Sequence, residues 1–149
     1  MHPTQPAVLV AGEDGWVRAY HLNSSGNSSS SAGGQQPFAT LRTADPTMQT
    51  DECAAVAVSD DGLQVAAASP TGAVRLWDLR AAVPLSDALA SSPPPPRVQL
   101  PGSHLPRADE GALALTFAPR WSRRNAAPLL VSGGADGAVR LNFRKPEKT

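Results

Sequence analysis

The sequence predicts an all-β protein made of repeated antiparallel sheets. Three stretches align without gaps over one pattern, in which a short apolar run, a turn containing glycine and a second apolar run follow one another. They are residues 8–21, 65–78 and 130–143. Alanine is frequent, but it stands in short runs with Val, Leu and Gly rather than at the spacings of three and four that a helix needs. Because a repeat outweighs local propensity, we expect β-hairpins in all three stretches.

Each hairpin is expected to turn on a glycine. Gly15, Gly72 and Gly137 hold the same place in the three stretches, and glycine tolerates the positive φ of a tight turn. Asp14 and Asp136 precede two of these glycines, which is typical of two-residue hairpin turns. The pattern also places an arginine three residues after each glycine, at Arg18, Arg75 and Arg140. We expect these arginines to share a packing or solvation role rather than to bind a partner.

Further apolar runs extend the hairpins into sheets. Residues 53–62 and 112–119 precede the second and third hairpins and predict an innermost strand for each. Residues 37–42 and 97–100 lie where an outermost strand would follow the first and second hairpins. The predicted unit is a four-stranded antiparallel meander. The first unit is expected to lack its innermost strand, and the third its outermost.

Residues 51–80 resemble one repeat of the WD-repeat β-propeller family, with the Trp-Asp pair at Trp77 and Asp78. The first hairpin is similar to the latter half of such a repeat, and residues 112–143 are similar to a third repeat with an inserted loop. The resemblance implies three blades. They are residues 1–42, a partial blade with a Ser/Gly loop at 23–36; residues 43–100, a full blade with a Pro-rich loop at 81–96; and residues 101–149, a blade lacking its last strand, with an Arg/Trp loop at 119–128. Since a ring takes typically four to eight blades, we expect an incomplete arc of about three.

Blades of this family are often braced by a buried network of His, Ser or Thr, Asp and Trp. The resemblance gives this structural role to Trp77 in the second repeat, to Ser132 and Asp136 in the third and to Asp14 in the first. The positions that depart from the pattern are Gln49, Ala67 and Thr71 in the second repeat, Ala108 and Asn142 in the third and Tyr20 in the first. No repeat is expected to hold the whole network, so apolar packing of small side chains between sheets should carry most of the stability.

The three loops are expected to project from one rim of the arc. The loop at 119–128 holds the chain's basic and aromatic cluster, a composition found at binding hot spots, and we predict a partner-binding site there. Its members are Arg120, Trp121, Arg123 and Arg124. The Ser/Gly loop predicts a flexible linker, and the prolines at 93–96 predict a polyproline II segment that acts as a spacer or as a ligand of aromatic grooves.

A second candidate contact is Arg80. The segment Trp77-Asp78-Leu79-Arg80 resembles the sequence by which some propeller proteins dock onto the adaptor of cullin-RING ubiquitin ligases. In that resemblance Arg80 is the contacting residue. Trp77 and Asp78 also have a structural interpretation, because the family carries this segment often without the docking role.

Composition and motif content narrow the function. Thirteen basic and 13 acidic residues balance, so the chain offers no general field for nucleic acid or membrane surfaces, and no apolar run approaches the roughly 20 residues of a membrane span. The lone Cys53 has no Cys or His at ligand spacing, is expected to be buried, and fits a cytoplasmic or nuclear protein. No catalytic set, metal motif or cofactor motif is found.

We therefore expect a non-enzymatic interaction scaffold whose partners are other proteins. Three explanations of the incomplete arc stay open: a truncated product, an arc completed by another chain, and an open arc. Two alternatives stay open. One is association with nucleic acid through the loop at 119–128, and the other is a substrate receptor of a cullin-RING ligase through Arg80.

Overall fold

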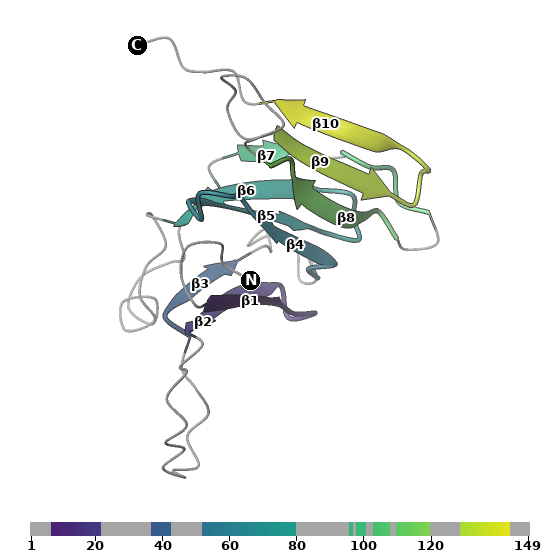
Figure 1. Ribbon diagram of the computed structural model, residues 1–149. Coiled ribbons are helices and arrows are strands. Elements are labelled where there is room, and N and C mark those ends of the chain that lie inside the picture. The colour runs from purple at the N-terminus through teal and green to yellow at the C-terminus, as the bar shows by residue number, and fades with distance from the viewer. Residues whose placement is uncertain are drawn as a thin grey trace.

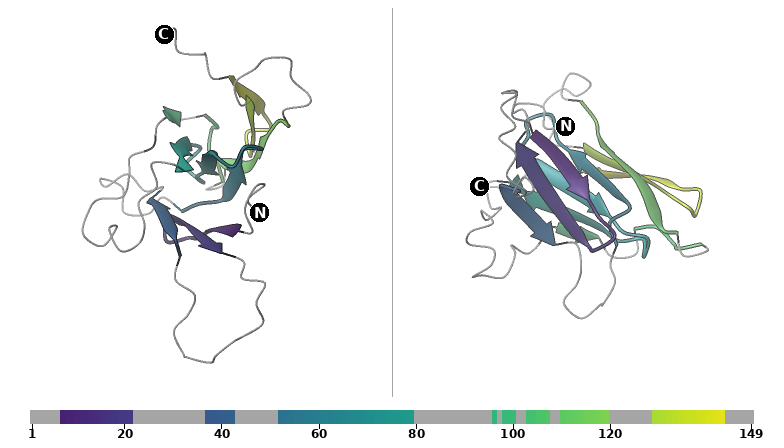
Figure 2. Two further views of the ribbon diagram at one scale, coloured as in Figure 1. Left: turned by 60° about the vertical axis from the view of Figure 1, so that its left-hand side comes forward. Right: turned by 90° about the horizontal axis from the view of Figure 1, so that it is seen from below.

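The computed structural model describes residues 7–21, 37–42, 52–79, 96, 98–100, 103–107, 110–119 and 129–143. These residues form three antiparallel sheets of three or four strands. In Figure 1 the sheets lie one above another, and Figure 2 shows that they fan out from each other. The all-β prediction is confirmed. None of the described residues forms a helix long and apolar enough to cross a membrane.

The first sheet has the strand order β1-β2-β3. Its strands are β1 (Ala7–Ala11), β2 (Trp16–His21) and β3 (Ala39–Arg42). β1 and β2 form the predicted first hairpin, in which Ala11 stands opposite Val17. β3 lies where an outermost strand was predicted and pairs with β2, so that Val17 stands opposite Leu41.

The second sheet has the strand order β4-β5-β6-β7. Its strands are β4 (Ala55–Val58), β5 (Gln64–Ala68), β6 (Val74–Asp78) and β7 (Val98–Leu100). Neighbours in the chain are neighbours in the sheet and all pairs are antiparallel. This is the four-stranded meander that the sequence predicts.

The third sheet has the strand order β10-β9-β8. Its strands are β8 (Ala112–Phe117), β9 (Leu129–Gly134) and β10 (Val139–Phe143). A bulge between Ala112 and Ala114 interrupts the pairing of β8 with β9, and β9 and β10 form the predicted third hairpin.

The core consists of two apolar layers, one on each face of the second sheet. Since successive side chains of a strand point to opposite faces, β5 sends Val65 and Ala67 toward the first sheet and Ala66 and Ala68 toward the third. The layer against the first sheet contains Val17, Leu41, Cys53, Val65, Ala67 and Trp77. The layer against the third contains Ala66, Ala68, Val74, Ala112, Phe117 and Leu130. Cys53 is buried, as predicted, and the alanines of β5 leave room for sheets on both sides.

Candidate functional site: the rim of hairpin turns

The three hairpin turns have the same local structure. Gly15, Gly72 and Gly137 adopt φ values of 73, 85 and 74°, in the left-handed region that favours glycine. In each turn the glycine N–H donates a hydrogen bond to the carbonyl three residues earlier, at distances of 3.2, 2.9 and 3.1 Å. The turns β1–β2, β5–β6 and β9–β10 are therefore equivalent parts of the three sheets.

Backbone hydrogen bonds join these turns into one continuous edge. The N–H of Cys53 donates to the carbonyl of Gly12 (3.2 Å), and the N–H of His104 donates to the carbonyl of Gly72 (3.0 Å). Each of these bonds links the turn of one sheet to the segment that leads into the next sheet. A third bond, from Ala135 to the carbonyl of Gly111 (2.9 Å), links that segment to the turn of the third sheet. We call this edge the turn rim; it comprises residues 12–16, 52–54, 69–73, 103–107, 110–111 and 134–138.

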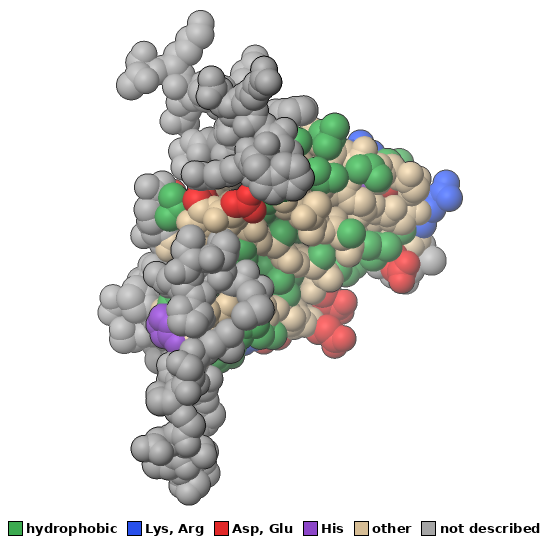
Figure 3. All heavy atoms as spheres, viewed as in Figure 1, with side chains coloured by type: hydrophobic (Ala, Val, Ile, Leu, Met, Phe, Trp, Pro, Cys, Tyr) green, Lys and Arg blue, Asp and Glu red, His purple; other side chains and the backbone are tan. Residues whose placement is uncertain are grey.

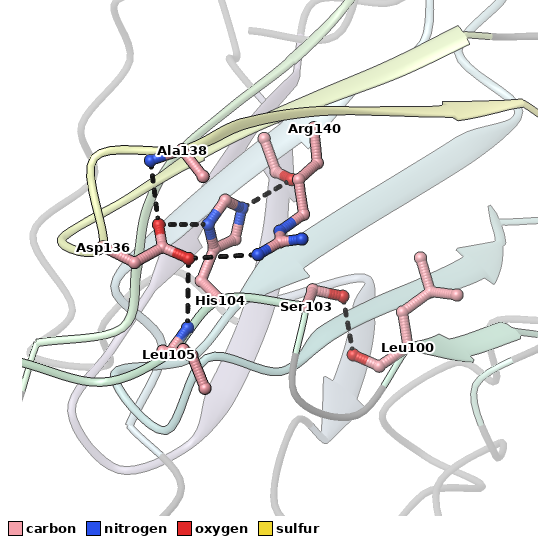
Figure 4. Close-up of polar contacts among 8 residues, drawn as sticks. Leu100, Ser103, His104, Leu105, Asp136, Ala138 and Arg140 are labelled. Carbon is pink, nitrogen blue, oxygen red and sulfur yellow. Dashed lines mark hydrogen bonds and ion pairs between the residues drawn. The ribbon is translucent and has the colours of Figure 1, made fainter.

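A buried polar network centres on His104. Its Nδ1 lies 3.0 Å from Oδ1 of Asp136, and its Nε2 lies 2.9 Å from Oγ of Ser132. The side chains of His104 and Ser132 are fully buried. Figure 4 shows the imidazole beside the Asp136 carboxylate, with the Arg140 guanidinium next to both. The network ties the segment before β8 to strand β9 and to the β9–β10 turn.

The Asp136 carboxylate accepts four hydrogen bonds at this junction. Besides His104, it accepts hydrogen bonds from the backbone N–H of Leu105 (3.2 Å) and of Ala138 (3.0 Å) and from Nη2 of Arg140 (3.2 Å). The hydrogen bond from His104, together with these others, holds the pKa of the Asp136 carboxyl well below its usual range. The carboxylate therefore stays ionised in the folded protein and fixes the geometry of the turn.

The order of Asp136, His104 and Ser132 is also that of a hydrolase triad, but the site does not suit that chemistry. A nucleophilic hydroxyl must reach a substrate, whereas Ser132 has no exposed surface. The His104 side chain likewise has no exposed surface, and the Asp136 side chain is only 9% exposed. Among the described residues, no three His, Cys, Asp or Glu side chains gather so as to hold a metal ion. The arrangement is suited to bracing a junction between sheets.

The structure corrects one assignment made from the sequence. Ala108 was placed at the histidine position of the third repeat, but His104 fills that role, four residues earlier. Ala108 itself lies outside the described residues. Counting back from β8 fails here because the segment before the strand is irregular, with an isolated bridge between Arg107 and Glu110. The signal that could have identified this position from the sequence is the presence of His104 in the connection before residues 112–119.

Two repeats hold complementary parts of the bracing network. In the second sheet Trp77 is buried, but its Nε1 has no hydrogen-bond partner among the described residues, because Ala67 stands where the third sheet has Ser132. In the third sheet Ser132 is present, but Asn142 replaces the tryptophan, and its buried Nδ2 also has no partner among the described residues. The second and the third sheet each therefore contain one buried N–H group of the network without a partner among the described residues, in keeping with the expectation that no repeat holds the whole network.

The equivalent arginines have different surroundings. Arg18 is ion-paired with Asp14 at 2.6 Å, and this hydrogen bond lowers the pKa of Asp14 and raises that of Arg18. Arg140 pairs with Asp136 at 3.2 Å in the same i, i+4 relation across the turn. Arg75, whose repeat has threonine instead of aspartate in the turn, is buried. The first and third turns are thus closed by a charged pair.

The turn rim also carries exposed side chains. Acidic residues lie exposed on it, and Figure 3 shows acidic side chains at the edge of the molecule where these turns lie. The exposed rim residues with large or charged side chains are Glu13, Asp14, Glu52, Leu105, Arg107 and Glu110. They come from the first turn and from the segments that enter β4 and β8.

The partner-binding residues predicted from the sequence are not among those described. Arg80, Arg120, Trp121, Arg123 and Arg124 all lie outside the described residues, and so do the three loops apart from Pro96 and Pro119. They remain predictions. Of the Trp77-Asp78 pair, the tryptophan is buried in the first apolar layer, and Asp78 ends β6 opposite Gln64.

Comparisons with known proteins bear on the fold. No protein-family model matches the chain, and no curated protein matches it in sequence. Among solved structures, it is similar to Chaetomium thermophilum Sqt1, a WD-repeat β-propeller protein whose crystal structure was determined bound to the N-terminus of the ribosomal protein L10. The TM-score is 0.60 at 19% identity, over 94% of this chain and 32% of Sqt1. The chain thus has a WD-repeat-like β-sheet fold and spans about a third of the length of Sqt1.

Proposed function

We propose that this protein is a non-enzymatic interaction scaffold that binds a peptide segment of a protein partner along the turn rim. The observation that carries the proposal is the continuous backbone bonding from the first turn to the third. A rim held in this way is ordered before a partner arrives, so binding loses little conformational entropy. The network at His104 has a bracing role in this proposal and no part in chemistry.

The charge of the rim favours a basic segment. Glu13, Glu52 and Glu110 add to the carboxylates of the two turn aspartates, while the rim arginine and the two arginines that pair with those aspartates oppose them. With Arg42, whose guanidinium lies over the ring of the rim residue Trp16, five carboxylates stand against four arginines and leave one negative charge in excess. Opposite charge steers encounter and fixes orientation at an interface. That Sqt1 was crystallised with a chain terminus of another protein supports a peptide as the kind of ligand.

A peptide titration tests the proposal. The probe is a synthetic peptide rich in Lys and Arg, and its control has the same length with Glu at the basic positions. We expect the basic peptide alone to bind in calorimetry and to shift the NMR amide signals of Gly15, Gly72 and Gly137. Glu13→Lys combined with Glu110→Lys should weaken binding about tenfold or more, since each rim charge contributes a modest share.

The matched control is Asp60→Lys. Asp60 is exposed on the β4–β5 turn, which is not part of the turn rim. Asp60→Lys changes the net charge by the same amount as each of the two Glu→Lys substitutions, but it lies outside the proposed binding surface. It should bind as the wild type does. Equal binding of the acidic and basic peptides, or shifts confined to residues away from the rim, would contradict the proposal.

A further inference from the structure

The outer face of the third sheet is apolar and open. On β10, Val139 is 73% and Leu141 56% exposed, and Val131 of β9 stands directly opposite Leu141 on the same face. The other face of this sheet is buried against the second sheet through Phe117 and Leu130. Hydrophobic side chains are visible over β8 to β10 in Figure 3. We call the surface formed by Val131, Val139 and Leu141 the β10 face.

The repeat shows what covers the equivalent surface in the other sheets. Val74 and Leu76 of β6 hold the positions of Val139 and Leu141, and they pack against the third sheet. Val17 of β2 holds the position of Val139 in the first sheet and is buried against the second. In both cases the cover is the face of a neighbouring sheet. The β10 face has the same chemistry and lacks that cover within the described chain.

The opposite end of the stack carries the matching surface. In the second sheet, Val65 and Trp77 pack against the first sheet. Val8 and Tyr20 occupy the equivalent positions of the repeat in the first sheet. Val10, two residues along β1 from Val8, is 49% exposed. These side chains alternate along the strands with those that pack on the second sheet, so they face outward. We call the surface formed by Val8, Val10 and Tyr20 the β1 face.

We infer that copies of this chain associate head to tail, with the β10 face of one copy covering the β1 face of the next. The contact would repeat the face-to-face packing already present at both junctions between sheets. A chain with no net formal charge sets up no general repulsion between copies. The contact uses two different surfaces, so it is heterologous, and each copy offers one surface of each kind. Neither face belongs to the turn rim, so the inference is independent of the proposed peptide site.

The test is the mass of the full chain in solution, measured by light scattering after size-exclusion chromatography over a wide concentration range. The wild type should be larger than a monomer. Val10→Glu alone and the double variant Val139→Glu/Leu141→Glu alone should each be monomeric, with association weakened by about 100-fold or more, because carboxylates would be buried in an apolar contact. An equal mixture of the two variants should form a heterodimer, since one intact β10 face then meets one intact β1 face.

Two controls keep the result specific. All three substituted side chains are exposed, so circular dichroism should show unchanged folding. Leu105→Glu adds the same charge at a side chain that is 67% exposed and outside both faces, and it should assemble as the wild type does. A monomeric wild type, an assembly that Val10→Glu leaves intact, an assembly that Leu105→Glu dissolves equally, or a mixture that stays monomeric would each overturn the inference.

Discussion

Replacing Gly72 by alanine tests how closely the second and third sheets approach each other at the turn rim. Gly72 has a φ of 85°, and an added Cβ would collide with the carbonyl oxygen of His104 and lie 2.8 Å from its carbonyl carbon. The His104 N–H also donates to the Gly72 carbonyl at 3.0 Å, so the two backbones can separate only by losing that bond. The left-handed φ costs an alanine about 1–2 kcal/mol, and the forced separation adds about 1–3 kcal/mol.

Gly137→Ala is the matched control. Gly137 occupies the same position of the third turn with a φ of 74°, but an added Cβ there would have nothing within 4 Å. Only the cost of the left-handed φ remains, so we expect a loss of about 1–2 kcal/mol in the free energy of unfolding. The difference between the two variants therefore measures the close approach alone.

The assay is urea unfolding followed by circular dichroism and by the fluorescence of the three tryptophans, of which Trp77 is buried. We expect Gly72→Ala to lose about 1–3 kcal/mol more than Gly137→Ala. Equal losses in the two variants would refute the reasoning, since the segment before β8 would then move aside at no cost.

Three further substitutions probe the polar network. His104→Ala removes one buried and one partly buried hydrogen bond and should cost about 2–4 kcal/mol in the same assay. Leu105→Ala next to it should cost less than about 0.5 kcal/mol, and similar losses in the two variants would argue against the bracing role. Ala67→Ser offers an acceptor to the indole N–H of Trp77 and should stabilise the protein by about 1 kcal/mol, so a less stable variant would contradict that geometry. Because folding lowers the pKa of Asp136, the unfolded chain takes up a proton at this residue before the folded chain does, and the free energy of unfolding falls as pH drops below about 4. Asp136→Asn should make the free energy of unfolding less dependent on pH in this range. An unchanged dependence on pH would contradict the lowered pKa of Asp136.

The hairpins were predictable because the signals for them are local. Alternation of apolar residues and a glycine with positive φ are properties of a few neighbouring residues, so the turns at Gly15, Gly72 and Gly137 follow from the sequence. The outermost strands at 39–42 and 98–100 were predictable for a similar reason, since each is a short apolar run after a hairpin. The order of strands within each sheet then follows from antiparallel pairing of chain neighbours.

The bracing histidine was not predictable, because its position depends on a contact between distant parts of the chain. His104 is placed by its bonds to Gly72 in one sheet and to Ser132 and Asp136 in another, and no spacing rule spans an irregular connection. The same holds for the arginines. Arg75 is buried and the Arg140 side chain is 43% exposed, although both stand in the same run Gly-Ala-Val-Arg-Leu.

The sequence by itself determined the all-β class, the three hairpins, their turn glycines and the resemblance to propeller blades. The tertiary structure decided which turns meet, which histidine braces the junction and which sheet faces are covered. The physical reason is that a strand pattern states which residues share a face, whereas burial of that face depends on what is stacked against it. Val74 and Val139 have the same place in the repeat, yet within the part of the chain that the structure describes a neighbouring sheet covers Val74 and none covers Val139.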